Sequence, residues 1–281
     1  MVTSSEPFLE KFRLQLFDLV EISVTEDADK LGTLVFGNSK SFVNKSIECA
    51  TGRNGFEQWK ELIQETLERT APTSFLFKVD WKNNKSNNET LYFRYVTGVS
   101  EESMAHLLAR YEALRTIPVA ISKKYAIGLP VCISIRIHRS EAMSVSIYYE
   151  ISGKTAGEIE NILTGIAEMM QWPADAIQSM LCKLDFMTGI GHPQYMAIGI
   201  PDKAIKISYP KVSVRDFGTC LDSFTTQECR KKEMKSLCRK LRQPALNYLG
   251  LKFNQQGCGW KAYLVISKKH AANSINYNIT F

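Results

Sequence analysis

Lysine, arginine and tyrosine residues recur at alternate positions of several short runs, where their side chains can act together on an anion. The recurring positions are Lys78, Tyr92, Arg94, Arg136, Tyr148, Lys206, Lys261 and Tyr263. Residues two apart in a β-strand point to the same face of the sheet, so this spacing predicts one shared polar face. Converging lysines and arginines bind polyanions such as phosphate, and tyrosine rings stack on aromatic ligands or shield a cation.

The polar face also has a simpler interpretation. An antiparallel sheet that stays open normally keeps one face wet, and a solvated face explains any single lysine. A wet face does not require cations and tyrosines to recur together on most hairpins. If the sheet closes into a barrel, these side chains converge on one cavity.

The elements that carry these residues form a repeated unit, in which an amphipathic helix precedes two alternating runs. In the first clear unit, a helix over 55–69 precedes strands 74–82 and 89–96, which an Asn-rich turn at 83–88 connects. Three more units follow: helix 100–115 with strands 130–139 and 143–152; helix 155–170 and a second helix after Pro173 with strands 193–201 and 203–211; helix 225–242 with strands 246–253 and 259–267.

The two ends of the chain carry weaker patterns. Residues 6–20 are consistent with a helix, and 31–36 and 43–50 with a degenerate first hairpin. Residues 274–281 alternate once more and predict an additional strand.

The short connections within each strand pair exclude crossovers, so the sheet must be antiparallel. About ten strands are too many for a strongly twisted open sheet unless it curls or closes. The alternate apolar positions, such as Ile133, Ile135 and Ile137, predict a face covered by helices. The expected fold is therefore α+β: repeated α-β-β-α units that form a closed antiparallel ten-stranded β-barrel with helices outside, as a single domain over 1–281.

The composition restricts the class of protein. A chain of 281 residues with 44% hydrophobic content can bury a sizeable core, and a net charge of +6 permits an anionic partner without demanding nucleic acid. The start of the chain lacks a signal-peptide pattern, and no run reaches the roughly 18 apolar residues of a membrane helix. The seven cysteines include no CxxC pair, so neither a disulfide framework nor a zinc site is indicated. We expect a cytoplasmic protein.

The repeated units, with inward lysine, arginine and tyrosine and with Lys-x-Tyr on the last barrel strand, resemble the aromatic prenyltransferases of the ABBA type, or PT barrels. The resemblance covers roughly residues 50–267, and its local likenesses are VDWKNNKSNNETLYFRY, KAIKISYP and YLGLKFNQQGCGWKAYLVIS. It implies an enzyme of natural-product biosynthesis that moves a prenyl group from an allylic diphosphate, dimethylallyl or geranyl, to an electron-rich aromatic acceptor. Such an acceptor would be an indole, a phenol or an aromatic peptide side chain.

The resemblance also implies roles for the polar face. The diphosphate-binding residues would be Lys78, Arg94, Arg136, Lys206 and Lys261. The residues that shield the allylic cation would be Tyr92, Tyr148, Tyr195 and Tyr263. Ionisation of the allylic C–O bond builds negative charge on the leaving diphosphate, which preorganised cations stabilise, while the rings keep water from the cation.

A carboxylate or a water molecule must afterwards remove a proton from the acceptor. Glu48, in the predicted first hairpin, matches the region where relatives carry an acidic residue that acts as base or magnesium ligand. Asp80 and Glu150 are the alternatives. A carboxylate beside Lys78 or Arg136 also has the simpler explanation that it balances their charge.

The chain lacks an aspartate-rich DDxxD string, which agrees with diphosphate binding by side-chain cations. The expectation is that no cofactor and no metal site are required and that magnesium is optional. The expected partners are an allylic diphosphate and an aromatic small molecule or peptide, without membrane or nucleic acid, for a monomer or weak dimer.

Two other functions remain open. A non-catalytic nucleic-acid or polyanion-binding protein would use basic and aromatic residues on an open sheet, with support from the basic stretch 229–242. That stretch also carries an apolar stripe, which instead indicates an amphipathic helix whose basic residues form its solvated side. No RNP-like string or KH-type loop occurs in the sequence. A ligand carrier with a polar barrel is the third option.

Overall fold

The computed structural model describes residues 19–25, 29–82, 85–109, 111, 116–138, 143–187, 189–224, 232, 236 and 245–267. The predicted strand at 274–281 lies outside these residues, as do all but two residues of the helix predicted at 225–242 and nearly all of the helix predicted at 6–20. No helix within the described ranges is long and apolar enough to cross a membrane.

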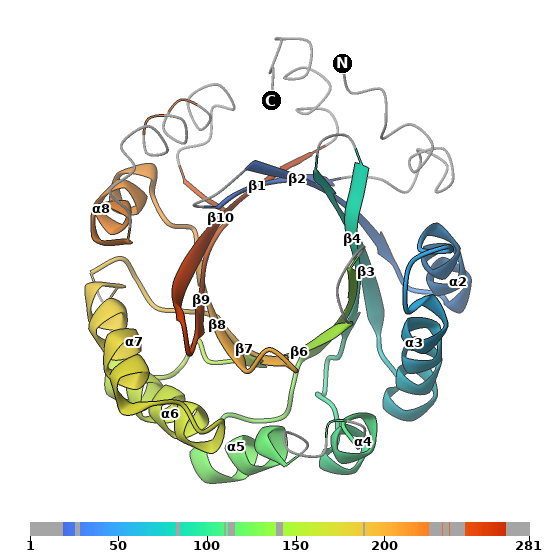
Figure 1. The fold of residues 1–281 in the computed structure, drawn as a ribbon, viewed down its shortest axis with the longest axis horizontal. Coiled ribbons are helices and arrows are strands. Elements are labelled where there is room, and N and C mark those ends of the chain that lie inside the picture. The colour runs from blue at the N-terminus through green and yellow to red at the C-terminus, as the bar shows by residue number, and fades with distance from the viewer. Residues whose placement is uncertain are drawn as a thin grey trace.

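The sheet is an antiparallel ring of strands, seen end-on in Figure 1. Neighbours in sequence pair with each other, and β1 (Leu19–Thr25) pairs with both β2 (Asp29–Gly37) and β10 (Gly257–Ser267), which closes the barrel. The remaining strands are β3 (Ser74–Lys82), β4 (Lys85–Arg94), β5 (Cys132–His138), β6 (Ser144–Glu150), β7 (Tyr195–Ile200), β8 (Ala204–Pro210) and β9 (Tyr248–Asn254).

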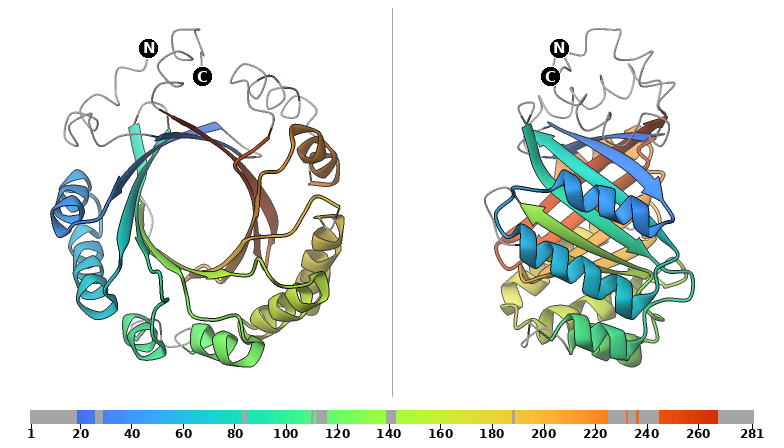
Figure 2. Two further views of the ribbon diagram at one scale, coloured as in Figure 1. Left: turned by 180° about the vertical axis from the view of Figure 1, so that it is seen from behind. Right: turned by 90° about the vertical axis from the view of Figure 1, so that its right-hand side faces the viewer.

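Helices surround this ring on its outer side in the views of Figures 1 and 2. They are α2 (Lys40–Cys49), α3 (Phe56–Thr70), α4 (Glu101–Leu107), α5 (Ile117–Tyr125), α6 (Ala156–Met169), α7 (Ala174–Met187) and α8 (Val214–Phe224). Side-chain caps set several starts: Ser100 begins α4 as predicted, and Thr155 and Glu158 form a capping box on α6.

The hydrophobic core fills the layer between the helices and the outer wall of the barrel. Trp59 on α3 and Phe77 on β3 are fully buried there, and the Trp59 indole N–H donates to the carbonyl of Ile135 at 3.3 Å. On β6, the buried Tyr149 hydroxyl donates to the carbonyl of Pro118 on α5 at 3.0 Å. The core therefore lies outside the ring, which leaves the inner face to polar side chains.

The antiparallel α+β architecture with helices outside is confirmed, and eight of the predicted strands coincide with β3 to β10 to within a few residues. The eleven residues of α8 include none that the sequence predicted to be helical.

Three predictions of local structure are wrong. Residues 43–49 form the C-terminal part of α2 instead of a strand, and Ala50 is its C-cap, because Phe42, Val43, Ser46 and Ile47 make a buried stripe of helical spacing. The Asn-rich segment 83–88 is not a loop throughout, since β4 begins at Lys85 after a register shift between Asp80 and Trp81. The helix predicted at 100–115 ends earlier, with α4 at Leu107.

Candidate functional site

The pairing register places the predicted polar face on one side of the sheet. Lys78 on β3 pairs with Thr90 on β4, and Thr90 pairs with Arg136 on β5. Lys206 on β8 pairs with Lys252 on β9. Since paired residues share a face, these side chains all line the lumen, while the apolar set faces the helices.

A cluster of cations surrounds one carboxylate inside the lumen. Lys78 and Asp80 are buried at 3% and 4% exposure, and the Lys78 Nζ lies 3.2 Å from the Asp80 Oδ1. Burial alone would raise the pKa of Asp80, but Lys78, Lys261 and Arg136 together hold it well below its usual range. Asp80 is thus a carboxylate that stays ionised and accepts protons poorly.

Arg136 crosses from β5 toward β4, where its Nε donates to the Thr90 hydroxyl at 3.1 Å. Burial disfavours its charge, yet Tyr92, Asp80 and other neighbours raise the pKa of Arg136. The guanidinium is therefore a permanent cation within the cluster.

Two lysines flank the ring of Tyr263 on β10. The Nζ of Lys78 is 5.5 Å from the ring centroid, and the Nζ of Lys261 is 4.8 Å from it. Gly250 on β9 leaves room for this ring, because a Cβ at Gly250 would lie 3.1 Å from a Tyr263 ring carbon. The two predicted diphosphate ligands thus lie against one predicted cation-shielding tyrosine.

A pair of tyrosines also lines the lumen wall. The rings of Tyr92 and Tyr148 have centroids 6.3 Å apart with planes at 50°. Burial, and then the neighbouring Tyr92, raises the pKa of Tyr148, so its hydroxyl remains a neutral donor. The pair offers ring faces and hydroxyl groups beside Arg136.

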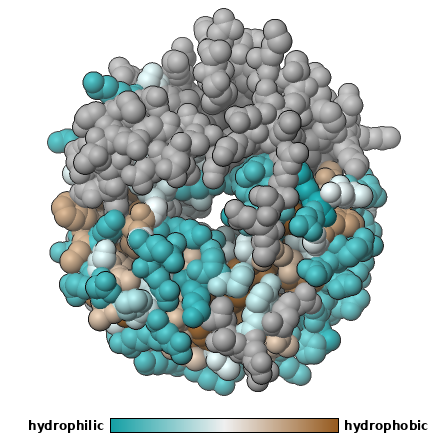
Figure 3. All heavy atoms as spheres, in the orientation of Figure 1, coloured by the Kyte–Doolittle hydropathy of each residue, from teal (hydrophilic) through white to brown (hydrophobic). Residues whose placement is uncertain are grey.

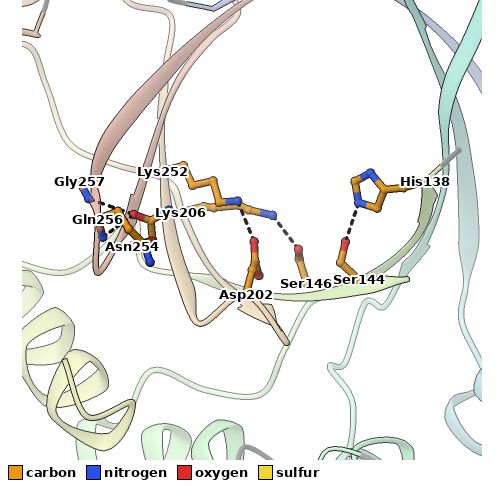
Figure 4. Close-up of polar contacts among 9 residues, drawn as sticks. All are labelled: His138, Ser144, Ser146, Asp202, Lys206, Lys252, Asn254, Gln256 and Gly257. Carbon is orange, nitrogen blue, oxygen red and sulfur yellow. Dashed lines mark hydrogen bonds and ion pairs between the residues drawn. The ribbon is translucent and has the colours of Figure 1, made fainter. Parts of the chain in front are cut away.

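A lysine pair extends the positive lining toward the hairpin between β7 and β8. The Lys206 Nζ donates to the Ser146 hydroxyl at 2.8 Å, and the Lys252 Nζ lies 2.7 Å from the Asp202 Oδ2, as Figure 4 shows. Burial, followed by Arg136, lowers the pKa of Lys206 to about 7, with Lys252 and Lys261 adding to the effect. Among the described residues, Asp202 acts on Lys206 without forming an ion pair as close as its 2.7 Å contact with Lys252, so an anion in the lumen would stabilise the charged form of Lys206.

The lowered pKa of Lys206 predicts a specific pH dependence. Between pH 7 and 10.5 the unfolded lysine binds a proton that the folded one releases, so this group's cost to stability falls as pH rises. Lys206→Met should therefore gain more stability at pH 7 than at pH 9, by about 2 kcal/mol. Urea unfolding of both proteins at the two pH values measures this difference. An equal gain at both values, or the same trend in Lys60→Met, would contradict it.

Small residues occupy much of the remaining lumen wall. By register they include Ser134, Ser146, Ala197, Gly199, Ser208 and Gly250. The space-filling view of Figure 3 shows an opening at the centre of the ring. Short side chains next to long cations leave room for a ligand within the barrel.

Two of the predicted binding residues, Arg94 and Tyr195, lie at one rim of the barrel, away from the central cluster. Arg94 is exposed at the last position of β4, and Tyr195 is half-buried at the first position of β7. Glu150, exposed at the end of β6, accepts a hydrogen bond from the Ser152 hydroxyl at 3.0 Å. Burial, and then Tyr248 and Glu150, raise the pKa of Tyr195. These residues form a rim where strands connect to helices.

The prediction that Glu48 lies in the first hairpin is wrong. It is exposed on α2, outside the barrel, because residues 40–49 are helical. Of Glu48, Asp80 and Glu150, the three carboxylates considered as the base, the fold brings Asp80 alone into the cation cluster.

Sequence reasoning missed the pairing of Lys252 with Asp202. Lys252 lies within the predicted strand 246–253, whereas Asp202 lies between the predicted strands 193–201 and 203–211, where the sequence gives no sign of a partner. Among the described residues, no group of three or more His, Cys, Asp or Glu side chains is arranged to hold a metal ion.

The barrel is shared with solved structures of very different sequence. The structure of NotF with brevianamide F and DMSPP matches with a TM-score of 0.65 and 11% identity, over 89% of this chain and 80% of that chain. The 6-dimethylallyltryptophan synthase from Micromonospora olivasterospora, with DMASPP and Trp, matches with a TM-score of 0.62 and 9% identity, over 89% and 81%. The prenyltransferase PriB, with L-tryptophan and dimethylallyl thiolodiphosphate, matches with a TM-score of 0.59 and 10% identity, over 91% and 80%.

These likenesses establish the fold. A scan against protein-family models finds no match, and neither does a search of curated proteins. The prediction of a prenyltransferase-type barrel is confirmed at the level of architecture.

Proposed function

We propose that this chain is an aromatic prenyltransferase whose closed ten-stranded barrel is the reaction chamber. The observation that carries the proposal is the convergence of Lys78, Arg136 and Lys261 on the carboxylate of Asp80 in the lumen. Lys206, which is coupled to Arg136, Lys261 and the carboxylate of Asp202, extends this group of cations. Such a cluster carries more positive than negative charge, which suits a diphosphate. The solved barrels of the same fold contain DMSPP or DMASPP together with tryptophan or brevianamide F.

In this proposal the cations act mainly on the leaving group. Breaking the allylic C–O bond transfers its electron pair to the diphosphate, and the preorganised ammonium and guanidinium groups stabilise that charge in a site with little water. Lys206 would take up a proton as the anion enters, because its pKa of about 7 rises beside a negative charge.

The tyrosines act on the other fragment. The allylic cation needs an environment that attracts positive charge without attacking it, and the faces of Tyr92, Tyr148 and Tyr263 provide that. The aromatic acceptor then attacks the cation, forming the new bond to the prenyl group. Arg94 and Tyr195 at the rim would contact the diphosphate or the outer part of the acceptor.

Side-chain cations would neutralise the diphosphate, with magnesium optional and no further cofactor. The described Cys132 and Cys182 are in the thiol form, which fits a protein working in a reducing cytoplasm. We expect a single domain that is a monomer or weak dimer.

Incubation with dimethylallyl, geranyl or farnesyl diphosphate and an indole or phenol acceptor tests the function. Mass spectrometry should show an acceptor heavier by one prenyl group, together with released diphosphate, and the product should still form with EDTA present. Heat-inactivated protein is the control for uncatalysed alkylation. The absence of product with every pair, together with salt-sensitive RNA binding, would favour the alternative of a polyanion-binding protein.

A further inference from the structure

His138 lies at the end of β5 in a row that crosses the lumen wall. Asp80 pairs with Asn88, and Asn88 pairs with His138, on strands β3, β4 and β5. His138 is half-buried, two residues from Arg136 on the same strand face. Figure 4 shows its ring on the inner side of the wall, with Ser144 of β6 beneath it.

Two neighbours fix the orientation and tautomer of this ring. The Nδ1 lies 2.9 Å from the Oδ1 of Asn88, whose side chain is buried at 7% exposure. An amide oxygen only accepts, so Nδ1 carries the proton and donates it. In the neutral ring, Nε2 therefore has the lone pair, and it lies 3.5 Å from the Ser144 hydroxyl.

The described carboxylates are poorly suited to accept the acceptor's proton. Asp80 is held ionised by three cations, so it is a weak base. Asp202 pairs with Lys252, which contributes to a lowered pKa, although burial alone would raise it. Glu150 is at the opposite end of β6 from Ser144. An imidazole, by contrast, changes protonation near neutral pH, where a general base is most effective.

We propose that Nε2 of His138 is the general base of the prenyl transfer, an inference that rests on the proposed function. After the acceptor carbon has bonded to the prenyl group, that carbon still carries its hydrogen. The proton passes to Nε2, and the C–H electron pair returns to the ring and restores its aromaticity. The resulting imidazolium then gives its proton to water.

The surroundings of His138 suit this cycle. The charged groups that neighbour it by register are Asp80 and Lys78 on β3 and Arg136 on its own strand. Asn88 on β4 and Ser144 on β6 are uncharged. Asp80 would favour the imidazolium that forms, while Arg136 would favour its return to the neutral ring.

His138→Gln is the principal test, with His192→Gln as the matched control, since His192 is exposed in the loop before Pro193. The kcat of His138→Gln should fall about 100-fold, with little change in diphosphate affinity. The acidic limb of the kcat–pH profile should disappear. In this variant, an acceptor that carries deuterium at the attacked carbon should react more slowly than the unlabelled acceptor, because proton loss has become rate-limiting.

A second variant separates chemistry from folding. In His138→Ala, added imidazole should restore part of the kcat, which a purely structural role would not permit. If His138→Gln keeps kcat within about threefold with an unchanged pH profile, the inference is wrong although the proposed function stands. Loss of diphosphate binding in His138→Gln would also overturn it. If the wild-type protein forms no adduct with any donor and acceptor, both proposals fail.

Discussion

Lys78→Met is expected to lower the free energy of unfolding by about 3 kcal/mol, the usual cost of removing one partner from a buried ion pair. The Lys78 and Asp80 side chains are exposed by 3% and 5%, and the substitution leaves the carboxylate buried without its closest cation. Lys261 and Arg136 still act on Asp80 in this variant, so we expect the loss of stability to be no larger than this. Urea unfolding at neutral pH measures the effect.

Two further variants show whether the loss arises from the stranded carboxylate. Lys78→Met combined with Asp80→Asn should recover much of the stability, because no buried charge is left without its partner. Lys123→Met breaks the ion pair with Glu101, whose 2.8 Å contact joins side chains exposed by 66% and 38%. That control should cost under about 1 kcal/mol. A double variant no more stable than Lys78→Met would refute this explanation.

Lys261→Ala should leave the fold intact and weaken binding of inorganic diphosphate about 30-fold, since a charge-assisted contact contributes about 2 kcal/mol. The side chain is half-buried in the lumen beside Tyr263, and alanine fits the strand without a new clash. Asp80 keeps its contact with Lys78 in this variant. Isothermal titration calorimetry gives the affinity, and circular dichroism shows whether the fold is retained.

The matched control is Lys60→Ala, which removes a lysine from the outer helix α3, where it lies 3.9 Å from Glu57. Its affinity for diphosphate should equal that of the wild-type protein. Unchanged affinity in Lys261→Ala would mean that the lumen cations do not act on one ligand. An equal loss in both variants would mean that binding reflects only net charge.

The sequence by itself determined which residues share a face. Alternation is a property of the extended backbone, so the positions of Lys78, Arg136 and Lys206 relative to their apolar neighbours follow from local geometry. The repetition of helix and hairpin also follows from periodicity, and it excluded a parallel sheet. These local features were sufficient to indicate the barrel and most of its polar lining.

The local pattern did not determine the secondary structure of two short stretches. The short pattern of residues 43–50 suits a strand or a helix until the buried stripe of α2 is seen. Glu48 was consequently placed in a first hairpin as a candidate base or magnesium ligand, whereas the fold puts it on the outer surface. The start of β4 within an Asn-rich segment depends on pairing with β3, which local propensity does not reveal.

Only the tertiary structure decided which residues of the shared polar face lie close to one another. Closure through β1 and β10 brings Lys261 toward Lys78 and Asp80, although more than half of the chain separates them in sequence. The same closure lowers the pKa of Lys206 and raises that of Arg136, because burial and neighbouring charge depend on the whole ring. The polar face was thus fixed by the alternation of each strand, and its chemistry by the register and closure that join strands distant in sequence.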